Sequence, residues 1–134
     1  TDKELAYNIG MPKTQSEYEA ENLDASKRRL KISIVYHDSG AIFHMVRYFD
    51  KKLTNNEVLE QMWCEWNRGS QRESQRFLNA QVRSMMCDDT VSIQEGGVTG
   101  STKHYICEMT GWGELDEKDP RAISIDKDVN KIQL

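Results

Sequence analysis

The sequence predicts an α+β fold in which two helices cover one face of an antiparallel sheet, in the order β-β-α-α-β-β. Three observations support this prediction. Residues 30–49 read as two strands joined by a turn, residues 54–67 carry apolar side chains at helical spacing, and residues 91–109 contain two further alternating segments. A chain of 134 residues is long enough to bury one core, so we expect a single α+β domain over residues 30–115.

Charged segments flank this expected domain. Residues 1–29 carry six acidic and five basic side chains, and only residues 14–26 within them suggest a short helix. Residues 116–134 form the C-terminal segment, in which residues 122–125 suggest an edge strand. Because neither segment has an extended apolar pattern, we expect both to be flexible arms at the surface.

The first expected elements form a hairpin. Apolar side chains alternate with others along a half-buried strand, at Leu30, Ile32, Ile34 and Tyr36. The turn at residues 37–40 contains an aspartate that can bond its own backbone and a glycine that accepts a positive φ. The second strand, residues 41–49, is apolar on both faces, which predicts a central place in the sheet.

Two helices are expected next, each starting at a capping box. In the first, Thr54 and Glu57 form the box, and apolar residues recur at positions 58, 59, 62, 63 and 66. Gly69 suits a left-handed residue that ends this helix. In the second, Ser70 and Glu73 form the box, which predicts a shorter helix up to Gln81 with its apolar side chains facing the core.

The last part of the core is expected to return to the sheet. Val91 and Ile93 indicate a short strand, and residues 95–101 indicate a flexible loop. A returning strand is indicated by alternate apolar positions, at Tyr105, Cys107 and Met109. Residues 111–113 then bend the chain, and Leu115 ends the core.

A stripe of arginines is the strongest candidate binding surface. Residues 67–83 hold four arginines and one acid. If residues 70–83 are helical, the positions i, i+4, i+7 and i+11 share one face, and they are occupied by Arg72, Arg76, Asn79 and Arg83. Like charges at this spacing repel, so the stripe suits an anionic partner such as a phosphate or an acidic protein surface. A solvated helix face is the simpler alternative.

A second candidate surface is acidic. Its side chains follow the expected core and are Glu114, Asp116, Glu117 and Asp119. They could imitate phosphate charge toward a host protein that binds nucleic acid. The net charge of −4 disfavours general nucleic-acid coating by the chain itself.

No chemical motif predicts catalysis. Cys87, His104 and Cys107 invite a metal interpretation, but His104 and Cys107 lie three apart on a strand and point to opposite faces. Asp88 and Asp89 could bind a cation as paired carboxylates, but a polar turn before the strand is the favoured interpretation. Nucleophile signatures and phosphate-binding loops are absent from the sequence. We therefore expect no enzyme activity, no metal and no cofactor.

Several of these segments together match one family pattern. They are residues 67–73 (Asn-Arg-Gly-Ser-Gln-Arg-Glu), Phe77, residues 83–85 (Arg-Ser-Met), residues 91–93 (Val-Ser-Ile), residues 105–107 (Tyr-Ile-Cys) and residues 111–112 (Gly-Trp). This pattern resembles the YodL-type module of small accessory proteins from phages, plasmids and conjugative elements. The resemblance covers about residues 31–115, roughly two thirds of the chain. It departs from the family at Asp88, where the family has a turn glycine.

The resemblance implies a context but carries no activity. It implies a mobile-element protein of the bacterial host cytoplasm, for which we expect binding to a host protein and inhibition of a defence system. Three widely spaced cysteines agree with a reducing compartment, and no apolar run is long enough for a membrane span. Two alternatives remain: a protein that sequesters a small anionic nucleotide through the arginines, and a DNA-binding regulator.

Overall fold

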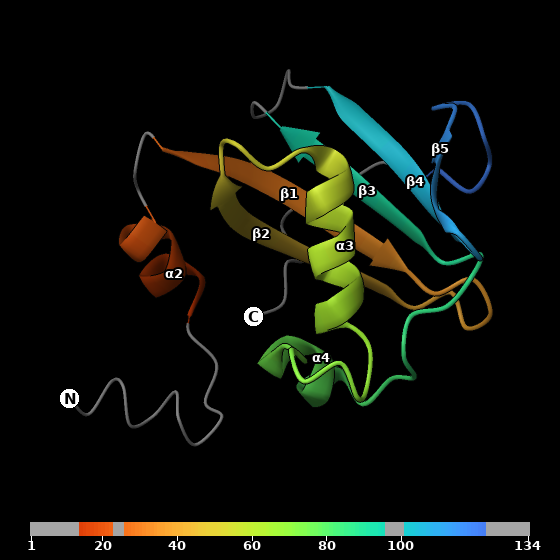
Figure 1. Cartoon of the computed structure of the whole chain (residues 1–134), viewed down its shortest axis with the longest axis horizontal. Coiled ribbons are helices and arrows are strands. Elements are labelled where there is room, and N and C mark those ends of the chain that lie inside the picture. Colours follow the sequence, from red (N-terminus) through yellow and green to blue (C-terminus); the bar gives the residue numbers. More distant parts are fainter. Residues whose placement is uncertain (1–13, 23–25, 96–100, 123–134) are drawn as a thin grey trace.

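The computed structural model describes residues 14–22, 26–95 and 101–122. Five strands form one antiparallel sheet in the order β2-β1-β3-β4-β5, shown in Figure 1. Along the chain, the elements are α2 (Gln15–Asn22), β1 (Lys27–Val35), β2 (Ile42–Asp50), α3 (Asn55–Glu65), α4 (Gln75–Ala80), β3 (Thr90–Glu95), β4 (Thr102–Glu108) and β5 (Gly111–Leu115). The predicted α+β class is confirmed.

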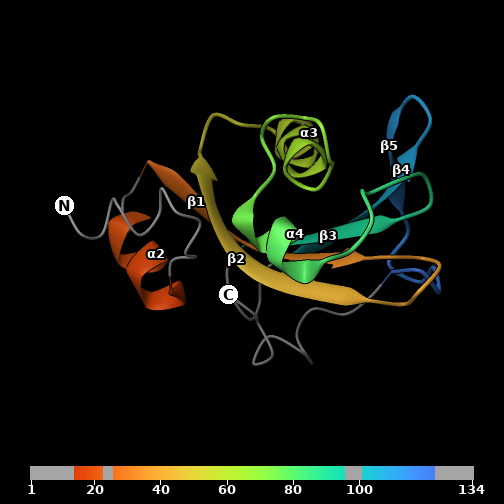
Figure 2. The same ribbon diagram turned by 90° about the horizontal axis from the view of Figure 1, so that it is seen from below.

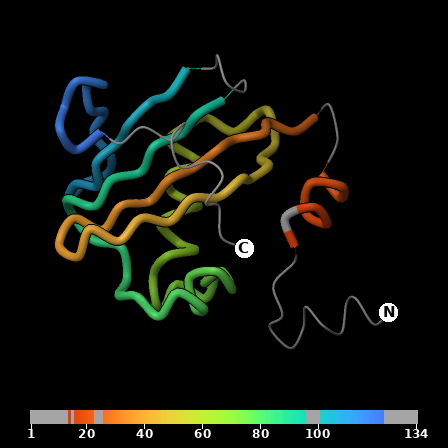
Figure 3. Tube along the Cα trace, turned by 180° about the vertical axis from the view of Figure 1, so that it is seen from behind, coloured from red at the N-terminus to blue at the C-terminus, as the bar shows by residue number. Residues whose placement is uncertain are grey.

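Helices and sheet form two layers. In Figure 2, α3 and α4 lie over the same face of the sheet, and α2 lies beside the edge that β2 forms. Figure 3 shows the sheet from the opposite face, where β4, β3, β1 and β2 run side by side. None of the helices within the described ranges is long and apolar enough to cross a membrane.

The expected hairpin is confirmed as β1 and β2. Its turn is closed by two backbone bonds: the Tyr36 amide donates to the Ala41 carbonyl and the Gly40 amide donates to the Tyr36 carbonyl. Gly40 has a φ of +75°, a conformation that costs little without a Cβ. The alternate side chains Leu30, Ile32 and Ile34 are fully buried under the helices.

The predicted central place of the second strand is wrong, because β2 is an edge strand. Its apolar second face is explained partly by α2. The Tyr18 ring packs edge-on against the Tyr48 ring at 5.6 Å, and the Tyr48 amide donates to the Tyr18 hydroxyl at 2.7 Å. A side chain from α2 thus satisfies a backbone donor that an open sheet edge leaves unpaired.

Helix α3 follows its sequence signals. The Thr54 hydroxyl accepts from the Glu57 amide and the Glu57 carboxylate accepts from the Thr54 amide, so the capping box is complete. Trp66 is fully buried at the C-cap, whereas Trp63 is only partly buried. Gly69 has a φ of +87°, but it follows the C-cap by three residues and does not end the helix.

The second capping box is wrong, because α4 begins at Gln75 with Ser74 as its N-cap. The Ser70 hydroxyl is used elsewhere: it donates to the Cys64 carbonyl and accepts from the Arg72 amide. Gln71 has a φ of +65°, which no helix tolerates. Residues 66–74 therefore connect α3 to α4, and the Ser70 hydroxyl bonds a carbonyl at the end of α3. Phe77 of the short α4 is fully buried as expected.

The C-terminal part of the sheet holds one strand more than expected within the described residues. Residues 111–113, expected to bend the chain, instead begin β5, which pairs with β4. Met109 does not belong to a strand and is 92% exposed in the turn between β4 and β5. Most of the expected loop at 95–101 and of the edge strand at 122–125 lies outside the described residues, as do the outer parts of both charged arms.

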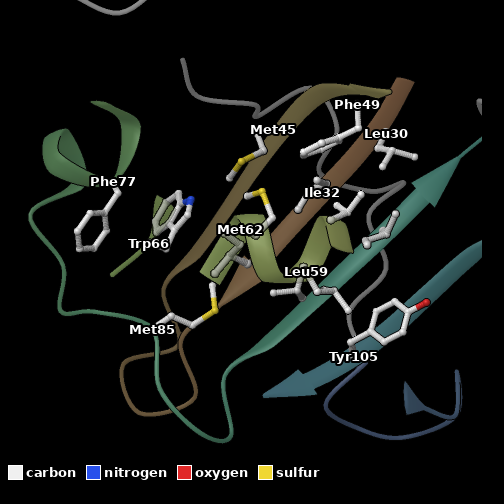
Figure 4. Packing of buried hydrophobic residues seen from close by; sticks show 14 of the residues in the cluster. Leu30, Ile32, Met45, Phe49, Leu59, Met62, Trp66, Phe77, Met85 and Tyr105 are labelled. Carbon is white, nitrogen blue, oxygen red and sulfur yellow. The ribbon is translucent and has the colours of Figure 1, made fainter. Parts of the chain in front are cut away.

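The core lies between the sheet and the two helices, as Figure 4 shows. Trp66 is at the centre of an aromatic group, with ring centroids 5.2 Å from Phe43, 5.7 Å from Phe77 and 6.4 Å from Tyr36. These contacts join α3, α4 and the first hairpin. Rings of this size contribute much of the buried apolar area of a small domain.

Candidate functional site

The expected continuous stripe of arginines does not form. Because α4 spans only six residues, Arg72 precedes it and Arg83 follows it. Only Arg76 and Asn79 lie on the helix, and the Asn79 side chain accepts from Gln75 at 2.9 Å. The four positions therefore have separate surroundings.

Arg83 is bound between two aspartates. Its guanidinium makes five hydrogen bonds, two to Asp38, two to Asp89 and one to the Ser84 carbonyl, which use all its N–H groups. Its Cζ lies 4.6 Å from the centroid of the Tyr36 ring, and the Tyr36 hydroxyl donates to the Arg83 carbonyl. Arg83 thus joins the β1–β2 turn to the segment that enters β3.

Asp89 is the buried centre of this network, with no exposed surface. Besides Arg83, it accepts from the amides of Met86 at 2.9 Å and His37 at 3.1 Å. Burial alone raises the pKa of its carboxyl, but the bonds from Arg83, Met86 and His37 outweigh burial and hold the pKa below its usual range. Arg83 also lowers the pKa of the Asp38 carboxyl.

His37, Asp38 and Asp89 offer ligand atoms within 4.8 Å of one another, the one such group of three among the described residues. Both carboxylates, however, already accept from the Arg83 guanidinium. A divalent cation would have to sit against this fixed positive charge, which opposes metal binding. Asp88, beside Asp89, is exposed with a φ of +78° and belongs to a turn, as the polar-turn interpretation of these two residues predicted.

Arg76, unlike Arg83, has no bonded partner for its guanidinium group among the described residues. Its guanidinium is half-buried and forms no hydrogen bond or ion pair with the described residues. The Nε atom is fully shielded from solvent and has no partner there. Burial, and then the nearby charge of Arg47, lower the pKa of Arg76. An unsatisfied buried donor costs about 1–3 kcal/mol, and more when it is charged.

The surroundings of Arg76 bring four elements together. Arg47 of β2 holds Glu65 of α3 through two parallel bonds, one of them 2.9 Å long, and its Nε donates to the hydroxyl of Tyr18 of α2. Tyr18 and Glu65 act in the opposite direction and raise the pKa of Arg76, but less than burial and Arg47 lower it. The Glu65 carboxylate is thus bonded to Arg47 but not to Arg76, although its charge also acts on Arg76. The cluster of Arg47, Arg76 and Glu65 carries one excess positive charge in a partly desolvated place.

Arg72 has a different neighbourhood. It lines a shallow hollow along the outer side of α3 with three glutamates, Glu57, Glu60 and Glu65. Because three carboxylates line the same hollow, its place is less suited to an anion than that of Arg76. The geometry selects Arg76 from the four expected positions.

The acidic surface is partly neutralised. Asp119 pairs with Arg121 at 2.8 Å, which lowers the pKa of its carboxyl to about 2, and Glu114 lies 3.9 Å from Lys103. Asp116 accepts from the Lys118 amide and, like Glu117, is exposed. Within the described ranges, Asp116 and Glu117 form no ion pair, so they remain the available part of this surface.

Sequence reasoning missed a row of paired serines and histidines across the sheet. His44, Ser33, Ser92 and His104 occupy facing positions on four neighbouring strands and are all buried. Each histidine Nδ1 lies 2.6 Å from a serine Oγ. A signal exists in the sequence, because both serines interrupt apolar strands on the face opposite the core. Ser33 and Ser92 are at most 2% exposed, so these hydroxyls pair within the sheet and are not presented to a substrate.

The metal site considered for Cys87, His104 and Cys107 does not form. His104 and Cys107 lie on opposite faces of β4, as their spacing predicts, with His104 in the serine-histidine row and Cys107 on the face of α3. Burial raises the pKa of Cys107 to about 11, so its thiol is protonated and weakly nucleophilic at neutral pH. His104 and Cys107 therefore have structural roles in β4.

No family model, curated protein or solved structure matches this chain. Function is therefore inferred from the side-chain geometry, in which Arg76 is a charged residue with a shielded donor that has no partner among the described residues.

Proposed function

We propose that this protein is a non-enzymatic binding protein that presents Arg76 to an acidic group of a partner protein. The observation that carries this proposal is the half-buried Arg76 guanidinium, which lacks a carboxylate or carbonyl partner within the described ranges. A carboxylate supplied by a partner would satisfy its donors and cancel the excess charge shared with Arg47. A bond to a charged group that is partly desolvated contributes about 1.5–3 kcal/mol.

The resemblance to YodL-type modules supports a bacterial host protein as the partner. In this proposal the protein is an accessory factor of a mobile element, acts in the host cytoplasm, and inhibits a host defence protein by binding to it. The exposed Asp116 and Glu117 provide a second surface of opposite sign, which suits a partner that normally binds nucleic acid.

Capture from a bacterial lysate tests the proposal. Tagged parent, Arg76→Glu and Lys52→Glu proteins would be compared by mass spectrometry, since Lys52 is an exposed cation in the β2–α3 connection and gives the same change in charge. We expect a host protein captured by the parent and by Lys52→Glu but lost with Arg76→Glu. With that protein purified, Arg76→Glu should weaken binding about 10- to 150-fold. Equal capture by all three would refute the role of Arg76.

A small anionic nucleotide is the second candidate, favoured by the two neighbouring guanidinium groups of Arg47 and Arg76. It predicts a rise in melting temperature with a nucleotide that Arg76→Glu abolishes, and no captured protein. A DNA-binding regulator predicts instead salt-sensitive duplex binding. The three measurements therefore distinguish the three proposals.

A further inference from the structure

Two cysteines come together where β3 begins and β4 ends, two neighbouring points of the sheet in Figure 1. The Asp88 amide donates to the Cys107 carbonyl and the Cys107 amide donates to the Asp89 carbonyl, both at 2.9 Å. Two residues thus oppose one, which makes a β-bulge, and Asp88 has the left-handed φ of +78° that suits the first position of such a bulge. Because the donating amide belongs to the peptide bond between Cys87 and Asp88, the main chain of Cys87 lies directly beside that of Cys107.

The side chains of Cys87 and Cys107 also meet. Both line a hollow between α3 and the β4–β5 turn. Burial first, and then the charge of Cys87, raise the pKa of the Cys107 thiol, and a hydrogen bond between the two side chains adds to this effect. Cys107 is buried and Cys87 is half-buried, so solvent reaches the pair from the side of Cys87. Cys64 lines a different hollow and takes no part.

This arrangement is the one that a disulfide requires. A disulfide needs neighbouring main chains and side chains that approach each other. The backbone bonds of the bulge supply the first condition, and the contact between the two thiols supplies the second. Both cysteines are free thiols in this structure, so the pair is in its reduced form.

We infer that Cys87 and Cys107, besides their places in the fold, form a reversible oxidation site that closes to an intramolecular disulfide with a low-molecular-weight disulfide such as oxidised glutathione. The bond would tie the end of β4 to the turn before β3. It would thereby also hold the Met86 amide, which donates to the buried Asp89. Arg76 does not line this hollow, so the inference is independent of the proposed function.

The reaction has two exchange steps. The Cys87 thiolate, the more accessible one, attacks oxidised glutathione, forms a mixed disulfide and releases one glutathione thiolate. The Cys107 thiolate then attacks the Cys87 sulfur, and the second glutathione thiolate leaves. The protons of the two cysteine thiols end on the two released glutathiones. Two cysteines are thus oxidised to one disulfide while one glutathione disulfide is reduced to two thiols.

The order of the steps follows from the surroundings of Cys107. A buried thiol with a raised pKa is a poor nucleophile toward an external reagent. Within the mixed disulfide its target is the adjacent Cys87 sulfur, and the high effective concentration of a well-placed neighbour offsets a small thiolate fraction. Cys87 no longer carries a thiolate at that stage, which removes one cause of the raised pKa of Cys107.

A redox titration tests the inference. The full chain with Cys64→Ser would be equilibrated in glutathione buffers of increasing oxidised fraction, blocked with N-ethylmaleimide and digested with trypsin. Cleavage after Arg83, Lys103 and Lys118 places the two cysteines in separate peptides, residues 84–103 and 104–118. We expect these peptides to be joined in oxidising buffer and separated again by dithiothreitol. Modified thiols without a joined peptide would overturn the inference.

The melting temperature shows whether the bond fits the native fold. Because a disulfide between β4 and the turn closes a loop of the chain, the oxidised protein should melt about 3–10 °C above the reduced protein. An equal or lower melting temperature would mean that the bond forms only by distorting the fold, and would overturn the inference.

Single variants in the same Cys64→Ser background test the order of the steps. Cys107→Ser should stop at the mixed disulfide, with glutathione retained on Cys87. Cys87→Ser should leave Cys107 at least about tenfold slower to react with oxidised glutathione, because its thiol is buried and protonated. Restoring Cys64 should not change the yield of the joined peptide. Equally fast reaction of Cys107 and Cys87 in the two variants would contradict the assignment of Cys87 as the first thiol.

Discussion

Arg76 and Arg83 come from one basic segment, seven positions apart, and have opposite surroundings. Arg83 is held by Asp38, Asp89 and a carbonyl, with every N–H group used. Arg76 has a shielded Nε atom without a partner among the described residues and lies near a second cation, Arg47. The difference shows that a run of like charges divides into residues that hold the fold together and residues that remain available for a partner.

The largest effect is expected at Arg83. Arg83→Met leaves the buried Asp89 carboxylate without its charged partner, so we expect the free energy of unfolding to fall by about 3–5 kcal/mol. Urea denaturation followed by tryptophan fluorescence measures this. A loss below about 1 kcal/mol would mean that Arg83 does not hold the β1–β2 turn to β3.

The acid dependence of stability should sharpen the same contrast. Because the pKa of Asp89 is lowered in the folded state, the unfolded chain binds the proton more tightly. The stability that Asp89 contributes is then present above the ordinary aspartate pKa of about 3.9 and is lost as the pH falls below it. Unfolding measured from pH 7 to pH 2 should show a shallower loss in Arg83→Met than in the parent. The same loss of stability with pH in both proteins would contradict the role of Arg83 in lowering the pKa of Asp89.

A smaller effect is expected at the edge of the sheet. Tyr18→Phe removes the hydroxyl that accepts from the Tyr48 amide and from Arg47 Nε, which should cost about 1–2 kcal/mol. Hydrogen exchange at the Tyr48 amide should become faster. Tyr48→Phe removes a hydroxyl that, among the described residues, bonds only the partly exposed side chains of Glu19 and Arg29. It is the matched control and should change stability by about 0.5 kcal/mol or less. Equal effects of the two substitutions would mean that Tyr18 of α2 does not stabilise the edge of the sheet.

The smallest effect on stability is expected at Arg76. Arg76→Met keeps the aliphatic stem and removes an unsatisfied, partly desolvated charge, so stability should stay within about 0.5 kcal/mol of the parent or rise. The same denaturation experiment used for Arg83→Met gives the direct comparison. A fall of about 2 kcal/mol would mean that Arg76 has a structural partner.

The sequence predicted the elements whose signals are local. The Thr54 capping box and the apolar spacing after it gave α3, and alternation around Gly40 gave the first hairpin. The same Ser-x-x-Glu pattern failed at Ser70, because that hydroxyl bonds the end of α3 and Gln71 takes a positive φ. Such a choice depends on how the end of one helix is satisfied by the next segment, which no local pattern contains.

The candidate site was only partly predictable for the same reason. The sequence indicated the basic segment and named Arg76, but assigned it to a stripe that the short α4 does not form. Arg83 is neutralised in part by Asp38, which is 45 positions away, so its pairing is a tertiary contact. Residues 111–113, expected to bend the chain, begin β5, and the pairing of β5 with β4 is not marked by a local pattern.

The central claim is that Arg76 is available to an anion and Arg83 is not. The arginine Nε–Hε region of a ¹H–¹⁵N correlation spectrum, assigned with Arg76→Met and Arg83→Met, tests it during a titration with inorganic pyrophosphate against sodium chloride of the same ionic strength. We predict that the Arg76 resonance shifts saturably with pyrophosphate while the Arg83 resonance stays in place. An unchanged Arg76 resonance, or equal shifts of both arginines, would contradict the account.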